Sequence, residues 1–418
     1  MSLLPAPSSA QDLFEKRRRG RRLELIGLTT KEIMKRIWPF SFYFLYFAAF
    51  ASLLPFFVLF YQRLGFNGAQ IGLLTGVPPL IILVGGPYLT GVADSTQRHR
   101  LIMGLGLAVA IGTMLIMPSM NAFGIVFILI MIFNFSMSPV SPLADSATMS
   151  MLGDERAMYG RIRLGGTIGW GLFAPIAGTL VENNGLRIAF LMFSMIMFIN
   201  FFVSQKFAFG KKEEQAAGKG GIRTLLANRG WVFFLLISFL GGVGAFSVAS
   251  YLFPYMAELG ANEGQMGIAL TIATLTEIPV FFFGDRLVRR FGSYGLFMIA
   301  LVLIGVRSLI YAVVHSTFQV FVLQAFSGTI FPAMWVAGVA YADENAPAGL
   351  KSTAQGLYGA VMFGFGSAVS GFVGGLLLES IGGRGMFLVL GIAILVGLAL
   401  IEGIKRLLPK EKTPQTIF

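Results

Sequence analysis

The chain has 418 residues, of which 56% are hydrophobic and only 12% are charged, and its formal net charge is +12. These values exclude a soluble globular domain, and the absence of cysteine excludes disulfides and thiolate metal sites. The motifs of a nucleotide loop, a metal cluster or a catalytic triad are missing, so we expect neither an enzyme nor a cofactor.

Charged residues separate long apolar segments along the whole chain. A membrane-spanning helix needs about 20 predominantly apolar residues. Twelve segments meet this requirement: 38–62, 68–92, 100–118, 122–149, 159–182, 187–206, 231–258, 264–288, 294–315, 317–342, 352–379 and 385–405. They are too long for barrel strands and lack the alternation that a barrel requires. We therefore predict an all-α membrane protein with twelve transmembrane helices.

The basic residues are distributed unevenly between the two sides of the predicted membrane. They gather before residue 38, in the central polar segment, near the C-terminal end and in the even-numbered connections. The other connections carry only Arg63, Arg187 and Arg384. Because cytoplasmic loops are enriched in Lys and Arg, we place both termini in the cytoplasm of a multi-pass cell-membrane protein. Topology thus accounts for the net charge, and we expect no nucleic-acid partner.

A polar stretch rich in Gly, Lys and Glu divides the spans into two sets of six. The predicted organisation is a basic cytoplasmic tail (1–37), an N-terminal six-helix bundle (38–206), a linker (207–230), a C-terminal six-helix bundle (231–405) and a second tail (406–418). Residues 30–38 could form an amphipathic helix on the inner leaflet, with a disordered tail as the alternative. SPLAD at 141–145 and VAYAD at 339–343 echo each other, which indicates two pseudo-symmetric halves.

The first span, FSFYFLYFAAFASLLPFFVLFYQ, is dense in aromatic residues. Such a stripe is more typical of packing or of a lipid-facing surface than of a cofactor site. Tyr43 and Tyr46 are nevertheless candidates for lining a cavity.

The connection after the second span, GVADSTQRHR, places an acid at a helix end before a basic cluster. Asp94 with Arg98 and Arg100 would form an ion-pair latch that breaks when the halves move. The segment FGDRLVRR in the second half repeats this pattern with Asp285 and Arg286. The alternative is an ordinary solvated loop.

The stretch from Pro142 to Gly178 contains an acid and an arginine on consecutive predicted helices. Arg163 follows Asp145 by 18 residues, across a short hairpin. A charge at the bilayer centre costs roughly 2.5–3.5 kcal/mol, so both residues need a partner or a water-filled cavity. Thr167 and Trp170 share a helix face with Arg163. We predict a binding cavity on that face.

Two further features frame this cavity. Gly165 and Gly169 lie on the opposite face of the same helix, a spacing suited to close helix packing. Pro139 and Pro142 precede Asp145 and predict a kink beside it. A purely structural role for Asp145 as a helix cap is the alternative.

The second half has few charges inside its spans. Glu277 lies within the eighth span and Arg307 within the ninth. Burial would favour the neutral form of Glu277, and a nearby arginine would favour its carboxylate. We therefore predict that these two residues, with Asp145, hold an exchangeable proton; a static structural pair is the alternative.

Polar and aromatic residues in the tenth and eleventh spans complete the predicted site. The tenth span contributes Gln324, Ser327 and Trp335, and the eleventh contributes Gln355 and Tyr358, one turn apart. We predict that these side chains make polar and stacking contacts with a substrate.

The segment YGRIRLGGTIGW resembles the fifth-helix signature of lactose-permease-like members of the major facilitator superfamily. The whole chain is most similar to the phenylpropionate-permease-like branch. The resemblance implies the major facilitator fold and assigns substrate binding to Asp145, Arg163 and, by stacking, Trp170. GVADSTQRHR likewise resembles the cytoplasmic gate motif, with Gly91 displaced by one position. The family has titratable residues where this chain has Gln324, Ser327 and Ile330, so Glu277 or Asp145 must carry any coupled proton.

The predicted function is secondary transport of a small polar organic solute, such as a sugar or nucleoside, by alternating access and proton symport. The expected partners are the solute, protons and membrane lipids, and we expect a monomer. The alternatives are an aromatic-carboxylate permease, an uncoupled facilitator, a drug-efflux antiporter and a non-transporting membrane receptor.

Overall fold

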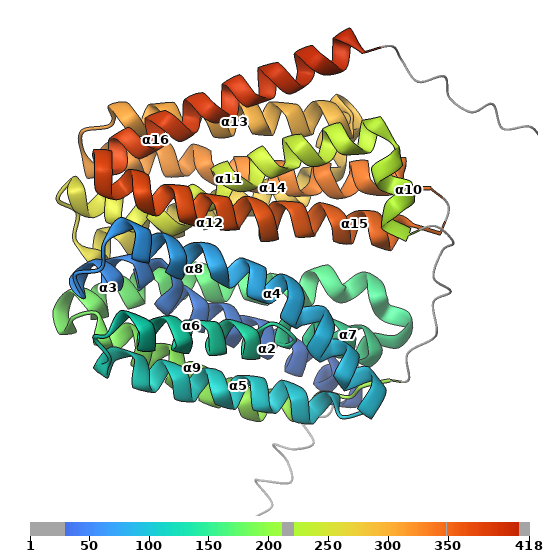
Figure 1. The fold of residues 1–418 in the computed structure, drawn as a ribbon. Coiled ribbons are helices and arrows are strands. Elements are labelled where there is room, and N and C mark those ends of the chain that lie inside the picture. Colours follow the sequence, from blue (N-terminus) through green and yellow to red (C-terminus); the bar gives the residue numbers. More distant parts are fainter. Residues whose placement is uncertain (1–29, 211–220, 348, 409–418) are drawn as a thin grey trace, which may run out of the picture.

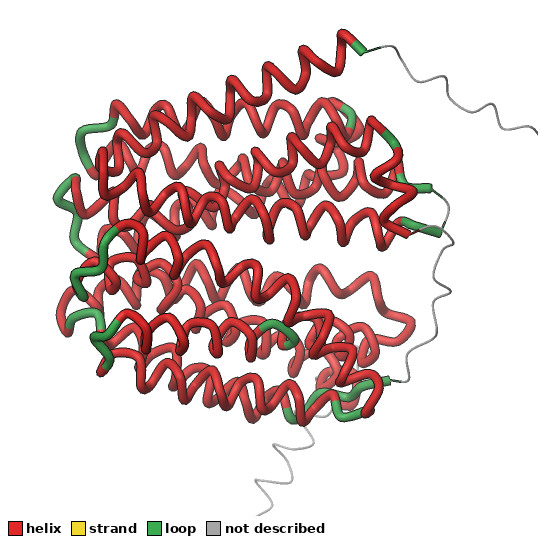
Figure 2. Tube along the Cα trace, viewed as in Figure 1, coloured by secondary structure: helices red, strands yellow, loops and turns green. Residues whose placement is uncertain are grey.

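The computed structural model describes residues 30–210, 221–347 and 349–408, and these are almost entirely helical (Figure 2). The predicted tails before residue 30 and after residue 408, and the centre of the predicted linker, lie outside the described residues. Within the linker, a short helix α10 (Gly221–Ala227) precedes the first helix of the second half. The domain boundaries remain a prediction.

The first half is built from helices that follow the predicted apolar segments closely. Its elements are α2 (Thr30–Leu53), η1 (Leu54–Phe56), α3 (Phe57–Arg63), α4 (Gly68–Thr96), α5 (His99–Ile116), η2 (Met117–Ser119), α6 (Phe123–Met137), α7 (Val140–Leu152), η3 (Gly153–Met158), α8 (Tyr159–Asn184) and α9 (Arg187–Ser204). The helix α2 begins before the predicted span, and Arg36 in it forms an ion pair with Glu155 of η3. The start of α2 is thereby tied to the connection between α7 and α8.

The second half is also built from helices that follow the predicted apolar segments. Its elements after α10 are α11 (Arg229–Glu258), α12 (Glu263–Phe291), α13 (Ser293–Val313), α14 (Thr317–Asn345), α15 (Lys351–Gly359), the π-helical turn η4 (Ala360–Gly366) and α16 (Ser367–Leu407). The chain reverses within α16 at Gly382, whose φ of 70° suits glycine (Figure 1).

Ten helical stretches of the described chain are long and apolar enough to cross a membrane. Two of them, Phe123–Asn184 and Lys351–Leu407, have 62 and 57 residues, which is far more than one crossing requires. Counting each of these two as a pair of crossings gives the predicted twelve. The first contains the break at Pro139, where α6 ends and α7 begins, so the predicted kink before Asp145 is confirmed.

The elements α2 to α9 lie together on one side of the molecule and α10 to α16 on the other (Figure 1). The two sides meet where α4 packs on α16 and α8 packs on α12. Glycines allow these helices to approach closely: a Cβ on Gly68 would lie 2.4 Å from the carbonyl oxygen of Gly375. A Cβ on Gly267 would lie at the same distance from the carbonyl oxygen of Ala174. Arg163 in α8 and Glu277 in α12 lie on the two helices that form the second of these contacts.

Candidate functional site

Two tyrosines hold the carboxylate of Asp145. The hydroxyl of Tyr43, in α2, donates to Asp145 Oδ1 over 2.5 Å. The hydroxyl of Tyr159, at the start of α8, donates to the same oxygen over 3.0 Å. Three helices thus converge on a partly buried acid. Both of these bonds use Oδ1, which leaves Oδ2 able to accept from a ligand hydroxyl or amine.

Arg163 lies beside the same tyrosine but does not pair with the acid. Its guanidinium carbon is 4.8 Å from the centre of the Tyr43 ring and 4.3 Å from the centre of the Phe47 ring. It makes no ion pair within the described chain. Its N–H groups form no hydrogen bond within the described residues, so they can donate to a ligand. Tyr43 therefore connects Asp145 and Arg163: its hydroxyl contacts one and its ring the other.

The two faces of α8 have different surroundings. A Cβ on Gly165 would lie 2.8 Å from the carbonyl oxygen of Phe40, and one on Gly169 would lie 2.1 Å from that of Phe44. The predicted close-packing face is thereby confirmed, with α2 as its partner. On the other face, Thr167 and Trp170 are partly exposed, and Trp170 makes no ring contact within the described residues. Its indole face is free to stack on a ligand.

The helix that carries Glu277 packs directly on α8. Thr271 in α12 donates from Oγ1 to the carbonyl oxygen of Gly171 over 2.9 Å, next to Trp170. Thr274 contacts the same glycine. Glu277 follows one turn later, partly buried, and forms no hydrogen bond or ion pair in the part of the chain that the structure describes.

The structure does not bring Glu277 and Arg307 together. Arg307 is 6% exposed, and its Nη2 donates to the carbonyl oxygen of Gly244 in α11 over 3.1 Å. Its Nε forms no hydrogen bond with any of the described residues. The predicted pairing of Glu277 with Arg307 is therefore wrong. Arg307 contacts α11 inside the second half, whereas α12, which carries Glu277, packs on α8 and α14.

The predicted residues of α14 and α15 lie mainly in the packed interior. Gln324 is 2% exposed and accepts from the hydroxyl of Tyr311 over 3.2 Å, and Ser327 is 5% exposed. Tyr358 is fully buried and donates to the carbonyl oxygen of Met334. These three are not accessible to a solute in this structure.

Trp335 and Gln355 differ from that group. Trp335 is partly exposed, and its ring stacks on Tyr358 with centres 5.7 Å apart. Gln355 is exposed, although Tyr358 one turn later is buried. The second half therefore offers fewer ligand-accessible polar groups than the sequence predicts.

The predicted cytoplasmic gate residues have local contacts. Asp94 pairs with His99 over 2.9 Å, and the His99 ring stacks on Phe209. Arg100 donates from Nε to the carbonyl oxygen of Phe207. In the second half, Asp285 and Arg286 are exposed, and Arg286 lies over the ring of Phe283 in its own helix. Arg98 is exposed as well. The latch between these groups remains a prediction.

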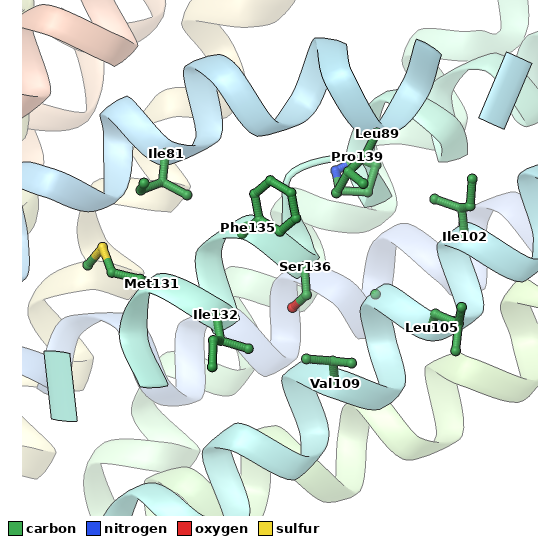
Figure 3. Close-up of a pocket in the computed structure, with 11 residues that line it drawn as sticks. Ile81, Leu89, Ile102, Leu105, Val109, Met131, Ile132, Phe135, Ser136 and Pro139 are labelled. Carbon is green, nitrogen blue, oxygen red and sulfur yellow. The ribbon is translucent and has the colours of Figure 1, made fainter. Parts of the chain in front are cut away.

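A pocket of about 520 Å³ lies between α4, α5 and α6, and no charged residue lines it (Figure 3). Its lining is almost wholly apolar and includes Ile81, Leu105, Val109 and Phe135. Leu105 is 54% exposed, so the pocket opens at the apolar outer surface of the helices. Its chemistry suits a hydrocarbon and not a polar solute.

Sequence reasoning missed two residues of the site. Tyr159 precedes the arginine signature and was not singled out, although a tyrosine at the start of a helix that follows a buried acid is a suitable donor. Phe47 was one aromatic among many in the first span. The signal that would find it is its spacing of four residues from Tyr43, which places both rings on one face of α2.

The model of the family described as "MFS_1 like family" matches residues 37–389. The chain belongs to this family. Its relatives include a maltose permease of Geobacillus stearothermophilus, 28% identical over 87% of this chain and 92% of the relative. A probable 3-phenylpropionic acid transporter of Escherichia coli is 24% identical over 84% of this chain and 93% of the relative.

The fold is similar to that of solved transporter structures. The nucleoside transporter NupG has a TM-score of 0.78, with 17% identity over 90% of this chain and all of that one. The resemblance to the major facilitator superfamily and its fold is thus confirmed. The chain is a multi-pass membrane protein, and the relatives reported above are named as a permease and a transporter.

Proposed function

We propose that this protein is a secondary transporter that moves a small polar organic solute, of the sugar or nucleoside class, by alternating access and proton symport. The observation that carries the proposal is the arrangement of Asp145 and Arg163. Asp145 accepts from the hydroxyl of Tyr43 and Arg163 lies over the Tyr43 ring, but the two charges do not pair with each other. A solute that bridges them would satisfy both charges at once.

Each residue has a distinct role in binding. Asp145 accepts from a solute hydroxyl, while Tyr43 and Tyr159 keep its carboxylate in place. Arg163 donates to a second hydroxyl, and Trp170 stacks on the apolar face of a ring. Thr167, Trp335 and Gln355 complete the polar and aromatic lining. The relatives named for maltose and nucleosides support this class of solute.

Glu277 is the proposed proton carrier. It is an acid inside a predicted span, it has no partner in the described chain, and its helix packs against the solute-binding face of α8. An unpaired acid in such surroundings exchanges its proton without breaking an ion pair. Since Arg307 contacts Gly244 instead, we assign it to the packing of the second half.

Alternating access requires the two halves to rock about this site. We propose that the protein works as a monomer in the cell membrane, with both termini in the cytoplasm, in accordance with the distribution of its basic residues.

An aromatic carboxylate is the second candidate solute. The relative named for 3-phenylpropionic acid and the exposed indole of Trp170 favour it. Arg163 would bind its carboxylate, but an ionised Asp145 would repel it. We therefore place the neutral solutes first. An uncoupled facilitator and a drug-efflux antiporter are the remaining alternatives.

A reconstitution experiment tests this proposal. Proteoliposomes with an inward proton gradient are given radiolabelled maltose, uridine or 3-phenylpropionate. We expect uphill accumulation of one neutral solute that collapses when a protonophore is added. Accumulation that is unchanged by the protonophore would contradict proton coupling. Uptake of 3-phenylpropionate alone would contradict the assignment to neutral solutes.

A further inference from the structure

One helix in each half begins with the same capping sequence. α4 starts in NGAQIG at 67–72 and α12 in NEGQMG at 262–267, which lie 195 residues apart. In both, the Asn side chain accepts from the backbone N–H of Gln, and the Gln side chain accepts from that of Asn. The N–H groups of a first helical turn carry partial positive charge, so a nearby carboxylate is stabilised.

Each of these helix starts receives a glutamate from the opposite half. Glu379, in α16, accepts at Oε2 from the backbone N–H of Gly68 over 2.7 Å. Glu182, near the end of α8, accepts at Oε1 from Nδ2 of Asn262 over 2.9 Å. The two glutamates end related sequences, GTLVE at 178–182 and GLLLE at 375–379, themselves 197 residues apart. The two contacts are therefore pseudo-equivalent.

Close backbone packing links these contacts to the position of the halves. A Cβ on Gly178 would lie 2.4 Å from the carbonyl oxygen of Glu263, and one on Gly375 would lie 2.6 Å from that of Gly68. An ion pair between Arg63 and Glu263, 2.7 Å long, adds a third bridge beside the α8–α12 seam. All of these contacts lie at the end of the molecule where α3 lies (Figure 1). The seams cannot part at this end while the glutamates keep their partners.

We propose that Glu182 and Glu379 are a pair of latch residues that hold the halves closed at this end and release together when it opens. The inference rests on the alternating-access cycle proposed above. It concerns the end opposite the predicted gate of Asp94 and Asp285. Because each carboxylate meets its helix start only while the halves touch, its interaction free energy favours the closed state alone.

The absence of cysteine from the chain allows a direct test. One spin-label pair, Asn121→Cys with His315→Cys, reports the distance between the halves at the latch end. A second pair, Ala157→Cys with Ser352→Cys, reports the opposite end. Distance distributions are measured by pulsed electron resonance on the ligand-free full chain in lipid nanodiscs.

Both glutamates are exposed, so we expect Glu379→Ala and Glu182→Ala each to raise the ratio of open to closed populations at the latch end by roughly two- to fivefold, the range for exposed charged contacts. The opposite end should close in step, and the double variant should show a larger shift. Ser380→Ala and Asn183→Ala are the matched controls, because within the described chain Ser380 donates to the carbonyl oxygens of Leu376 and Leu377, and Asn183 to that of Thr179, all in their own helices. They should leave both distributions unchanged.

Unchanged distributions in both glutamate variants would overturn the latch. So would broadening at both ends together with a lower Tm, since that indicates general loosening. A wild-type protein with two populations and active uptake, but no response to either substitution, would contradict the latch alone. A wild-type protein with one fixed distance at each end and no uptake would contradict the proposed function as well.

Discussion

The polar residues of the two halves have different surroundings. In the first half, Asp145 and Arg163 are partly exposed and share a tyrosine without pairing. In the second half, Arg307, Gln324 and Tyr358 are buried and bond to backbone or to neighbouring side chains. A pseudo-symmetric fold thus carries an asymmetric site. We therefore propose that solute recognition belongs mainly to the first half, and that the second half contributes Glu277 and a few accessible side chains.

The largest expected effect comes from Arg163, and Arg307 provides the comparison in the other half. Arg163→Ala should weaken solute binding by about 10- to 100-fold, because a hydrogen bond to a charged group contributes about 1.5–3 kcal/mol. Arg307→Met removes a charge that the described chain does not neutralise, and it should leave affinity within about threefold. Titration calorimetry on both variants measures these affinities. Equal losses of affinity would contradict the claim that the two halves contribute differently to solute binding.

Glu277→Gln tests the contribution of the second half. The variant keeps a similar shape but cannot exchange a proton, so uphill accumulation should disappear while exchange of labelled for unlabelled solute continues. Transport assays in proteoliposomes measure both rates. Retained uphill accumulation in this variant would take the proton role away from Glu277.

Removing a single hydroxyl should give a smaller effect. Tyr43→Phe keeps the ring beneath Arg163 but loses the hydrogen bond to Asp145, so affinity should fall by about 3- to 10-fold. Tyr358→Phe is the control, because its hydroxyl bonds to Met334 in the packed interior. Its affinity should match that of the wild type. A drop of equal size in both variants would show that Tyr43 acts only through packing.

The smallest functional effect should come from the packing face of α8. A methyl group at Gly169 would meet the backbone of α2, so Gly169→Ala should destabilise the protein by about 1–3 kcal/mol with little change in affinity. Gly160→Ala, in the same helix, has no atom within 4 Å of its new methyl group. A thermal unfolding comparison in detergent should show a lower Tm for the first variant only.

Much of the fold could be predicted from the sequence because membrane spans depend on simple apolar length. The helices α4, α5 and α12 begin within one residue of their predicted starts. The packing face formed by Gly165 and Gly169 also followed from spacing alone. Local patterns of this kind need no knowledge of the partner helix.

The pairing of side chains between helices could not be predicted in the same way. It depends on the rotation of each helix about its axis, which spacing within one helix does not define. Arg307 therefore reaches Gly244 and not Glu277, and Tyr159 was overlooked as a donor to Asp145. Glu182 and Glu379 were missed for another reason: an acid at the end of a span resembles any solvated residue until the opposite half is in place.

The central claim is that one solute bridges Asp145 and Arg163. The most direct measurement is binding of the transported solute to the wild type, Asp145→Asn, Arg163→Ala and the double variant, analysed as a double-mutant cycle. The account predicts that either single substitution removes most of the affinity and that the second adds little, so the two effects are strongly non-additive. Independent, additive losses, or unchanged affinity in both single variants, would contradict it.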